Sequence, residues 1–307
     1  MPTPINHWFE IPEVSPSMAE IVLFKNKLGG SDGLTGDLLV EVNKHNLEIT
    51  KKDDTFEIKA LKMPKDALFQ YLIKSIGDGE KVTIKQINNS SKPKLFDKYV
   101  SWGKRAAKGR KDFFDEDNSS LLRRFVISAA MTTFLAILTI LVGLISYIQM
   151  WGLLLAVTLG FTLISWVINF YAKKRISVYT QKGEVLANEL RGFRQMLRDI
   201  EDINIAEVGD LILWEQILPY AVAFGVSDKV IKALKMRFKK EIETDPGFVY
   251  YYYWGASGLS ANMDFTSSIA NSFESNNSSN SSVVGSSGGF SGGSSGGFGG
   301  GSGGGAF

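Results

Sequence analysis

Residues 125–172 read FVISAAMTTFLAILTILVGLISYIQMWGLLLAVTLGFTLISWVINFYA, a run of 48 residues without Asp, Glu, Lys, Arg or His. A bilayer core about 30 Å thick is crossed by about 20 residues of helix. The run therefore has room for two spans, at residues 125–145 and 153–171, with a short turn between them. Neither span shows the polar face that the helices of a soluble core keep. The sequence predicts a two-helix transmembrane hairpin within residues 119–172.

Lys and Arg residues flank this hairpin on both sides, whereas residues 146–152 between the spans carry no charge. Because cytoplasmic loops are enriched in these cations, we expect a multi-pass protein of the cell membrane with both termini cytoplasmic. The cations are also expected to contact the anionic lipids of the inner leaflet. They are Lys104, Arg105, Lys108, Arg110, Lys111, Arg123, Arg124, Lys173, Lys174 and Arg175.

Small residues recur every fourth position in the second span, at Gly152, Ala156 and Gly160. This spacing lets helix backbones approach closely in lipid, so we interpret the three as helix-packing residues. The first span has a similar series at Ser128, Thr132 and Ala136. Contact within the hairpin and contact with another subunit both remain open. The spans contain no ionisable residue, which argues against an ion path through them.

Residues 1–118 have the composition of one small cytosolic domain of mixed α and β structure. Alternation of apolar and polar residues around Asp53-Asp54 predicts a strand hairpin. Helices are expected at residues 15–28 with Ser15 as N-cap, at 35–46 with Thr35 as N-cap, at 64–76 and at 92–109, with a short extended or helical piece at 82–87. Two helices before a two-stranded ribbon are typical of a winged-helix-like module.

Winged-helix modules often bind DNA, so a nucleic-acid partner has to be weighed. Residues 84–124 hold eleven Lys or Arg against five Asp or Glu, and clustered cations supply most non-specific affinity for DNA. Most of these cations, however, directly precede a membrane span, where topology already explains them. The expected helix 35–46 offers only Lys44 and His45 to a groove. Nucleic acid is therefore an unlikely partner in this interpretation.

The segment after the hairpin, residues 173–241, is predicted to contain cytosolic amphipathic helices. An apolar stripe runs along residues 179–200, and it fits either the membrane surface or the first domain. Residues 211–225 carry one charge and contain Pro219, which predicts a bent, buried or interfacial helix; a third crossing is the alternative. Residues 242–307 end in a Gly- and Ser-rich stretch that is too polar to fold and is expected to be disordered.

One part of this segment resembles a known family. The run Leu213-Trp214-Glu215, Leu218-Pro219-Tyr220-Ala221, Ala223-Phe224-Gly225-Val226 is similar to the LWE, LPYA, ALGV stretch of the domain-of-unknown-function 2207 family of predicted bacterial membrane proteins. The opening Glu10-Ile11-Pro12 with Ser15-Pro16 and the final Ala306-Phe307 are similar to that family too, so the resemblance covers most of the chain.

The resemblance implies a winged-helix-like cytosolic region that follows an extracytoplasmic β-domain and a membrane span. This sequence starts after both, as expected of a truncated or split member or of a fragment. The family has no assigned catalytic residues. Within the resembling run we expect Trp214, Leu218, Pro219 and Tyr220 to bind a partner.

The sequence lacks the residue patterns of several common catalytic and metal-binding sites. The chain has no cysteine and two histidines, and it contains no metalloprotease helix motif, P-loop, or paired nucleophile and base. We therefore expect no enzyme, no cofactor, no metal and no small-molecule substrate. The sequence predicts a mainly α membrane protein that acts as a scaffold or regulatory module, with a protein partner or a second copy of itself. The alternative is a membrane-tethered nucleic-acid-binding regulator.

Overall fold

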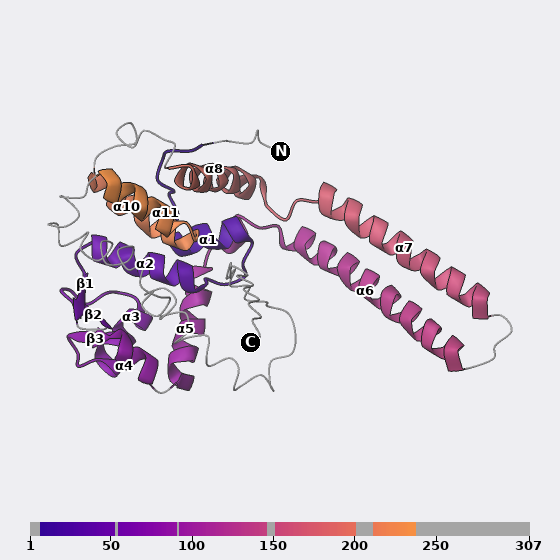
Figure 1. Ribbon diagram of the computed structural model, residues 1–307, viewed down its shortest axis with the longest axis horizontal. Helices are drawn as coiled ribbons and strands as arrows, with labels where there is room; N and C mark the ends of the chain where they lie inside the picture. The colour runs from indigo at the N-terminus through magenta and orange to yellow at the C-terminus, as the bar shows by residue number, and fades with distance from the viewer. Residues whose placement is uncertain (1–6, 53–54, 91, 146–150, 201–210, 238–307) are drawn as a thin grey trace, which may run out of the picture.

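The computed structural model describes residues 7–52, 55–90, 92–145, 151–200 and 211–237. In these residues a helical body carries one small sheet, and two long antiparallel helices project from it (Figure 1). The predicted tail 242–307 lies outside the described residues. The predicted class, mainly helical with a small sheet and two candidate membrane-spanning helices, is confirmed.

The body takes its elements from both sides of the projecting pair in the sequence. Before the pair come α1 (Pro16–Phe24), α2 (Ser31–Asn43), β1 (Leu47–Lys52), β2 (Thr55–Ala60), α3 (Ala67–Tyr71), η1 (Leu72–Ile76), β3 (Lys81–Thr83), α4 (Ile84–Asn89), α5 (Lys92–Ala106) and η2 (Arg110–Asp112). The pair is α6 (Glu116–Ile145) and α7 (Trp151–Arg175), and α8 (Gln181–Arg198), α10 (Leu211–Ala223) and α11 (Ser227–Arg237) follow it.

The start of α1 is as predicted. The Ser15 hydroxyl accepts a hydrogen bond from the Met18 N–H at 3.2 Å, and Pro16 presets the first helical φ angle. The helix ends earlier than expected, because Lys25 adopts a φ of 61° and its N–H bonds back to the Ile21 carbonyl.

The predicted start of the second helix was wrong. Gly30 is the residue before α2, and Thr35 lies within the helix, fully buried. The Thr35 hydroxyl donates to the Ser31 carbonyl at 3.0 Å, so it bonds to its own helix instead of capping one.

The sheet confirms the predicted hairpin and extends it. β1 and β2 pair antiparallel, and β3 adds a third antiparallel strand beside β2. Ile58 is opposite Ile49 on one side and Val82 on the other, and all three side chains are buried. Residues 82–87 divide at Thr83, which forms a capping box with Gln86 and starts α4.

The helices after the membrane pair pack onto helices before it. α8 lies against α1, and α10 lies along α2 (Figure 1). Side chains from both segments form one continuous core, including Ile21, Leu38, Phe193 and Trp214. The described residues of the predicted first domain and of the predicted region at 173–241 therefore pack together in space. The apolar stripe on α8 was predicted to lie either on the membrane surface or against the first domain, and in the structure it packs against the first domain.

The position of α10 also excludes a third membrane crossing. Ile217 and Leu218 are fully buried in the body, and Gly36 of α2 lies directly against the carbonyl of Pro219. The helix has 13 residues, fewer than the roughly 20 that a span needs.

In the hairpin, the faces that α6 and α7 turn toward each other follow steps of three and four residues. The less exposed residues include Leu122, Phe125, Ala129, Thr132, Ala136, Thr139 and Gly143 on α6, and Trp151, Leu155, Thr158, Thr162, Ser165, Asn169 and Ala172 on α7. The outward faces carry large exposed Leu, Ile, Val and Phe side chains. A polar seam inside an apolar exterior reverses the pattern of a soluble helix pair, and lipid favours this arrangement.

Two polar side chains of the seam bond across it. The Trp151 Nε1–H donates to the Thr139 carbonyl at 2.9 Å, and Thr162 Oγ1 lies 3.2 Å from the Thr132 carbonyl oxygen. Because hydrocarbon supplies no water, such contacts keep hydroxyl and indole groups satisfied at membrane depth.

The predicted packing residues Gly152, Ala156 and Gly160 lie outside this seam. Gly152 and Ala156 are exposed, and a Cβ atom added at Gly152 or Gly160 would meet nothing within 4 Å. Of the two alternatives for these residues, contact within the hairpin is therefore wrong, because the seam runs along another face of α7. Contact of this ridge with another subunit stays a prediction.

Candidate functional site

The hairpin leaves the body through a short clasp, formed by residues 112–118 at the start of α6 and 176–180 after α7. Phe114 and Tyr179 form an antiparallel bridge, and the Thr180 N–H donates to the Phe113 carbonyl at 3.1 Å. The clasp thus ties the two ends of the hairpin to each other.

Tyr179 also ties the clasp to the body. Its hydroxyl donates to the Val22 carbonyl of α1 at 2.7 Å, and its ring centroid lies 5.1 Å from that of Phe114. Burial raises the pKa of the Tyr179 hydroxyl, so the group stays protonated and remains a donor. Through this tyrosine the hairpin is fixed to the core instead of hanging on a flexible linker.

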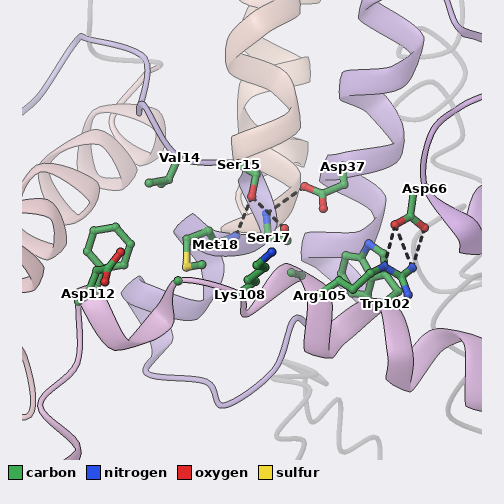
Figure 2. A pocket seen from close by; sticks show the side chains of 13 residues that line it. Val14, Ser15, Ser17, Met18, Asp37, Asp66, Trp102, Arg105, Lys108 and Asp112 are labelled. Carbon is green, nitrogen blue, oxygen red and sulfur yellow. Dashed lines mark hydrogen bonds and ion pairs between the residues drawn. The ribbon is translucent and has the colours of Figure 1, made fainter.

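A cleft of about 510 Å³ opens in the body between the start of α1, α2 and α5 (Figure 2). A second hollow of about 370 Å³ shares Val14, Ser15, Asp37, Asp66 and Trp102 with it and reaches Tyr220 of α10. The two hollows therefore adjoin, and segments from both sides of the hairpin line them. Among the described residues that line the two hollows there is no histidine.

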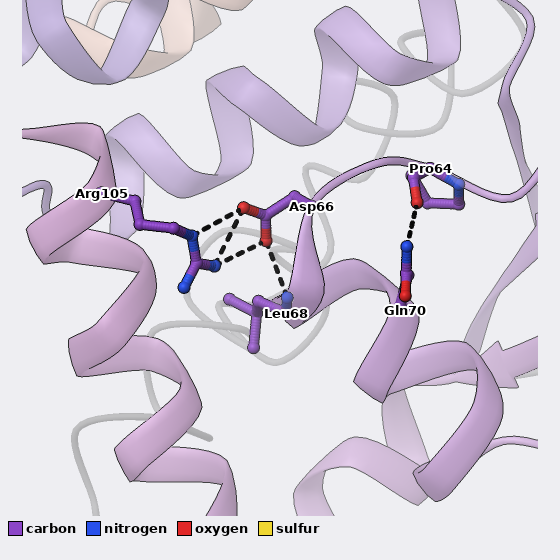
Figure 3. Close-up of polar contacts among 5 residues, drawn as sticks. All are labelled: Pro64, Asp66, Leu68, Gln70 and Arg105. Carbon is purple, nitrogen blue, oxygen red and sulfur yellow. Dashed lines mark hydrogen bonds and ion pairs between the residues drawn. The ribbon is translucent and has the colours of Figure 1, made fainter. Parts of the chain in front are cut away.

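Two carboxylates in the cleft differ in how they are compensated. Asp37 accepts a hydrogen bond from the Ser17 N–H at 3.2 Å, and burial raises its pKa to about 6. Asp66 caps the start of α3 by accepting a hydrogen bond from the Leu68 N–H at 2.7 Å. It also pairs with the Arg105 guanidinium at 2.9 Å (Figure 3). Asp66 is thus neutralised by Arg105 of α5 and hydrogen-bonded to the start of α3, whereas Asp37 faces the hollow with the backbone amide and the hydroxyl of Ser17 as its partners.

A third carboxylate, Glu20 of α1, is buried behind the cleft and holds the start of α2. It is 6% exposed and accepts the Gly30 N–H at 3.0 Å. A Cβ atom at Gly33 would lie 2.2 Å from its Oε2 atom, so this close approach requires glycine. Burial raises the pKa of Glu20 to about 8 against the opposing effect of the Gly30 amide.

The raised pKa of Glu20 predicts a pH dependence of stability. Between pH 4.5 and about 8 the folded protein holds a proton that the unfolded chain releases, so stability falls as pH rises through this range. Glu20→Gln mimics the protonated form and should flatten that slope while the protein stays folded at pH 8. Thermal unfolding of both proteins at pH 5, 6.5 and 8 measures this, and an unchanged slope in the variant would contradict the assignment.

Among the described residues, no group of three or more His, Asp or Glu side chains is placed to hold a metal ion. A family model for the C-terminal domain of DUF2207, described as a predicted membrane protein, matches residues 4–234. The chain belongs to the DUF2207 family. Neither the comparison with curated proteins nor that with solved structures yields a match. The family name and the two apolar helices together make this a membrane protein.

The predicted cations of this DUF2207 domain occupy three different places. Arg123, Arg124 and residues 173–175 are exposed at the body end of the hairpin, where α6 and α7 become polar. Lys104 and Arg105 instead lie on α5, and Arg105 and Lys108 line the cleft. Arg105 forms an ion pair with Asp66. Arg110 and Lys111 lie beside the clasp: Arg110 donates to the Asn26 carbonyl at 3.0 Å, and Lys111 lies 3.9 Å from Glu116.

The expected partner-binding residues of the domain lie inside the body. Trp214, Leu218 and Pro219 are buried, and the Tyr220 hydroxyl is held by the carbonyls of Pro12 and Val14. Apolar residues on α10 pack against α2, so no surface of Trp214 or Leu218 is left for a partner. The predicted role in partner binding gives way to a role in packing, and of the four only Tyr220 borders the cleft.

Sequence reasoning missed the clasp and Asp37 as functional features. The signal for the clasp was the presence of Phe113, Phe114 and Tyr179 just outside the charged ends of the hairpin. Asp37 gave no signal, because its burial depends on α10 lying across α2, nearly 180 residues later in the chain.

Proposed function

We propose that this protein is a membrane-anchored scaffold whose cytoplasmic body docks a protein partner in the cleft around Asp37. The observation that carries the proposal is that one core contains helices from both sides of the hairpin, with the clasp at its edge. A partner bound to such a body is held at a fixed position relative to the bilayer. A binding role fits the cleft because its lining combines charged and apolar side chains, including Asp37, Trp102 and Lys108.

The cytoplasmic orientation follows from charge. Arg123, Arg124 and residues 173–175 are all at the body end of the hairpin, and residues 146–150 at the other end have no charge. The excess of cations on the cytoplasmic side of membrane proteins therefore supports placing the body, and with it both termini, in the cytoplasm.

The arrangement of α2 weighs against the nucleic-acid alternative. The order of two helices and a strand ribbon supports a winged-helix-like unit, in which the helix before the ribbon would enter the DNA groove. That helix, α2, lies against α1 and α10, and Asp32 is its only exposed residue. An exposed aspartate repels phosphate, so we do not propose DNA binding.

Single cysteines test the proposal cleanly because the chain has none of its own. A membrane-impermeant maleimide applied to intact cells should label Ser146→Cys and leave Lys108→Cys and Lys59→Cys unlabelled. In inverted vesicles, a photoreactive maleimide at Lys108→Cys, on the cleft rim, should give a discrete protein adduct that Asp37→Asn abolishes. Lys59→Cys, exposed on β2, is the matched control. Labelling of Lys108→Cys from outside, or equal adducts at both positions, would refute the proposal.

A further inference from the structure

Four cations surround the aromatic rings of the clasp. The Arg110 Cζ atom lies 3.9 Å from the centroid of the Phe114 ring, and the Lys25 Nζ and Arg191 Cζ atoms lie 5.3 and 5.9 Å from that of Tyr179. Lys182 Nζ lies 5.3 Å from the Phe113 ring. These four come from the end of α1, from η2 and from α8, so only the fold brings them together.

The charges of this cluster are not cancelled inside the protein. Within the described part of the chain no ion pair joins any of the four cations to a carboxylate. Two nearby carboxylates are already engaged: Asp115 accepts the Asn118 N–H at 2.9 Å, and Glu116 lies 3.9 Å from Lys111. Glu116 also acts electrostatically on Arg110 but forms no ion pair with it, so the four cations remain open to an outside anion.

The hairpin sets the height of this cluster above the bilayer. α7 has its last apolar residue at Ala172 and ends at Arg175, about 5 Å further along its axis at 1.5 Å per residue. The headgroup layer extends about 5–8 Å beyond the hydrocarbon. Tyr179 follows four residues after Arg175, so the clasp lies at the outer edge of the headgroup layer, from where its long Lys and Arg side chains reach the lipid phosphates.

We propose that Lys25, Arg110, Lys182 and Arg191 form a binding site for the phosphate of anionic lipid headgroups. The inference rests on the proposed placement of the body against the inner leaflet. Guanidinium groups bind phosphate oxygens in pairs and ammonium groups add point charges. Because each cation is held against a ring, less side-chain freedom is lost on binding. Lipid bound here also stabilises the clasp, since the same rings join the hairpin to the core.

The test uses the full chain purified in detergent and titrated with dioleoyl phosphatidylglycerol, dioleoyl phosphatidylcholine or inorganic phosphate, with thermal stability as the readout. Phosphatidylglycerol should raise the unfolding temperature in a saturable manner, and phosphatidylcholine and inorganic phosphate should not. The triple variant Lys25→Gln, Lys182→Gln, Arg191→Gln should weaken the lipid effect about fivefold per cation removed. Arg110 is kept because it also supports Asn26.

The matched control removes the same charge from exposed residues of the body away from the clasp, in Lys59→Gln, Lys62→Gln, Lys65→Gln. It should respond to phosphatidylglycerol within twofold of the unchanged protein. Single variants at Lys25 and Lys182 keep the test valid if the triple variant unfolds. Equal losses in both triple variants, or equal stabilisation by inorganic phosphate, would overturn the lipid site. These results need neither a partner nor a fixed orientation, so they are independent of the cysteine test above.

Discussion

Replacing Trp214 by alanine is expected to lower the free energy of unfolding of the body by about 3–5 kcal/mol. Trp214 is fully buried and is among the largest side chains of the core. It lies on α10, which packs along α2, and the Asn43 side chain donates to the Glu215 carbonyl beside it. Removing the indole leaves a cavity at the contact that joins the two halves of the body. Denaturant unfolding of the full chain in detergent measures the loss.

Trp166→Ala provides the control with the same change of side chain. Trp166 is half exposed on α7, outside the body, and its Nε1–H donates to the Thr133 hydroxyl of α6 at 3.1 Å, so its removal should affect the hairpin and leave unfolding of the body nearly unchanged. The comparison also separates packing from partner binding. If Trp214 were a surface residue for a partner, Trp214→Ala would keep full stability while the cleft adduct was lost, and the place of α10 in the core would be refuted.

The hairpin was predictable because lipid imposes a simple rule on sequence. A charge-free run of sufficient length has few folded alternatives, and its flanking cations mark both ends. Which face of each helix meets the other was not predictable from spacing alone. Gly152, Ala156 and Gly160 and the seam through Thr158, Thr162 and Ser165 both repeat at helical intervals. In the structure the helices meet along the polar seam, where Trp151 and Thr162 bond across to the other helix.

The packing of the segments before and after the hairpin into one core was beyond sequence reasoning for a different physical reason. An apolar stripe such as Leu190, Phe193 and Leu197 indicates that a helix face is buried, but it does not identify the element that covers this face. α10 illustrates the same limit: its low polarity indicated burial correctly, and the covering helix, α2, is encoded far upstream. Candidate residues that depend on this contact, Asp37 above all, therefore became visible only in the folded chain.

Gly183 is the position where a single added carbon should do most damage to the clasp. It lies near the start of α8, where its N–H donates to the Thr180 hydroxyl at 3.1 Å. A Cβ atom there would lie 1.9 Å from the carbonyl oxygen of Phe113 and 2.7 Å from its carbonyl carbon. These are backbone atoms of the clasp, so they cannot move aside as a flexible side chain would. Either α8 or the bridge between Phe114 and Tyr179 must shift.

Gly183→Ala should therefore destabilise the protein by about 1–3 kcal/mol, although glycine to alanine within a helix normally stabilises by up to about 1 kcal/mol. Gly152→Ala, a helical glycine with open space around it, should show the normal sign. Hydrogen exchange gives the local readout, because the amides of Asp115 and Thr180 bond across the clasp to Val178 and Phe113. Faster exchange at these two amides in Gly183→Ala alone would locate the damage. A variant as stable as the original, with both amides protected, would show that the clasp does not join hairpin and body as the structure describes.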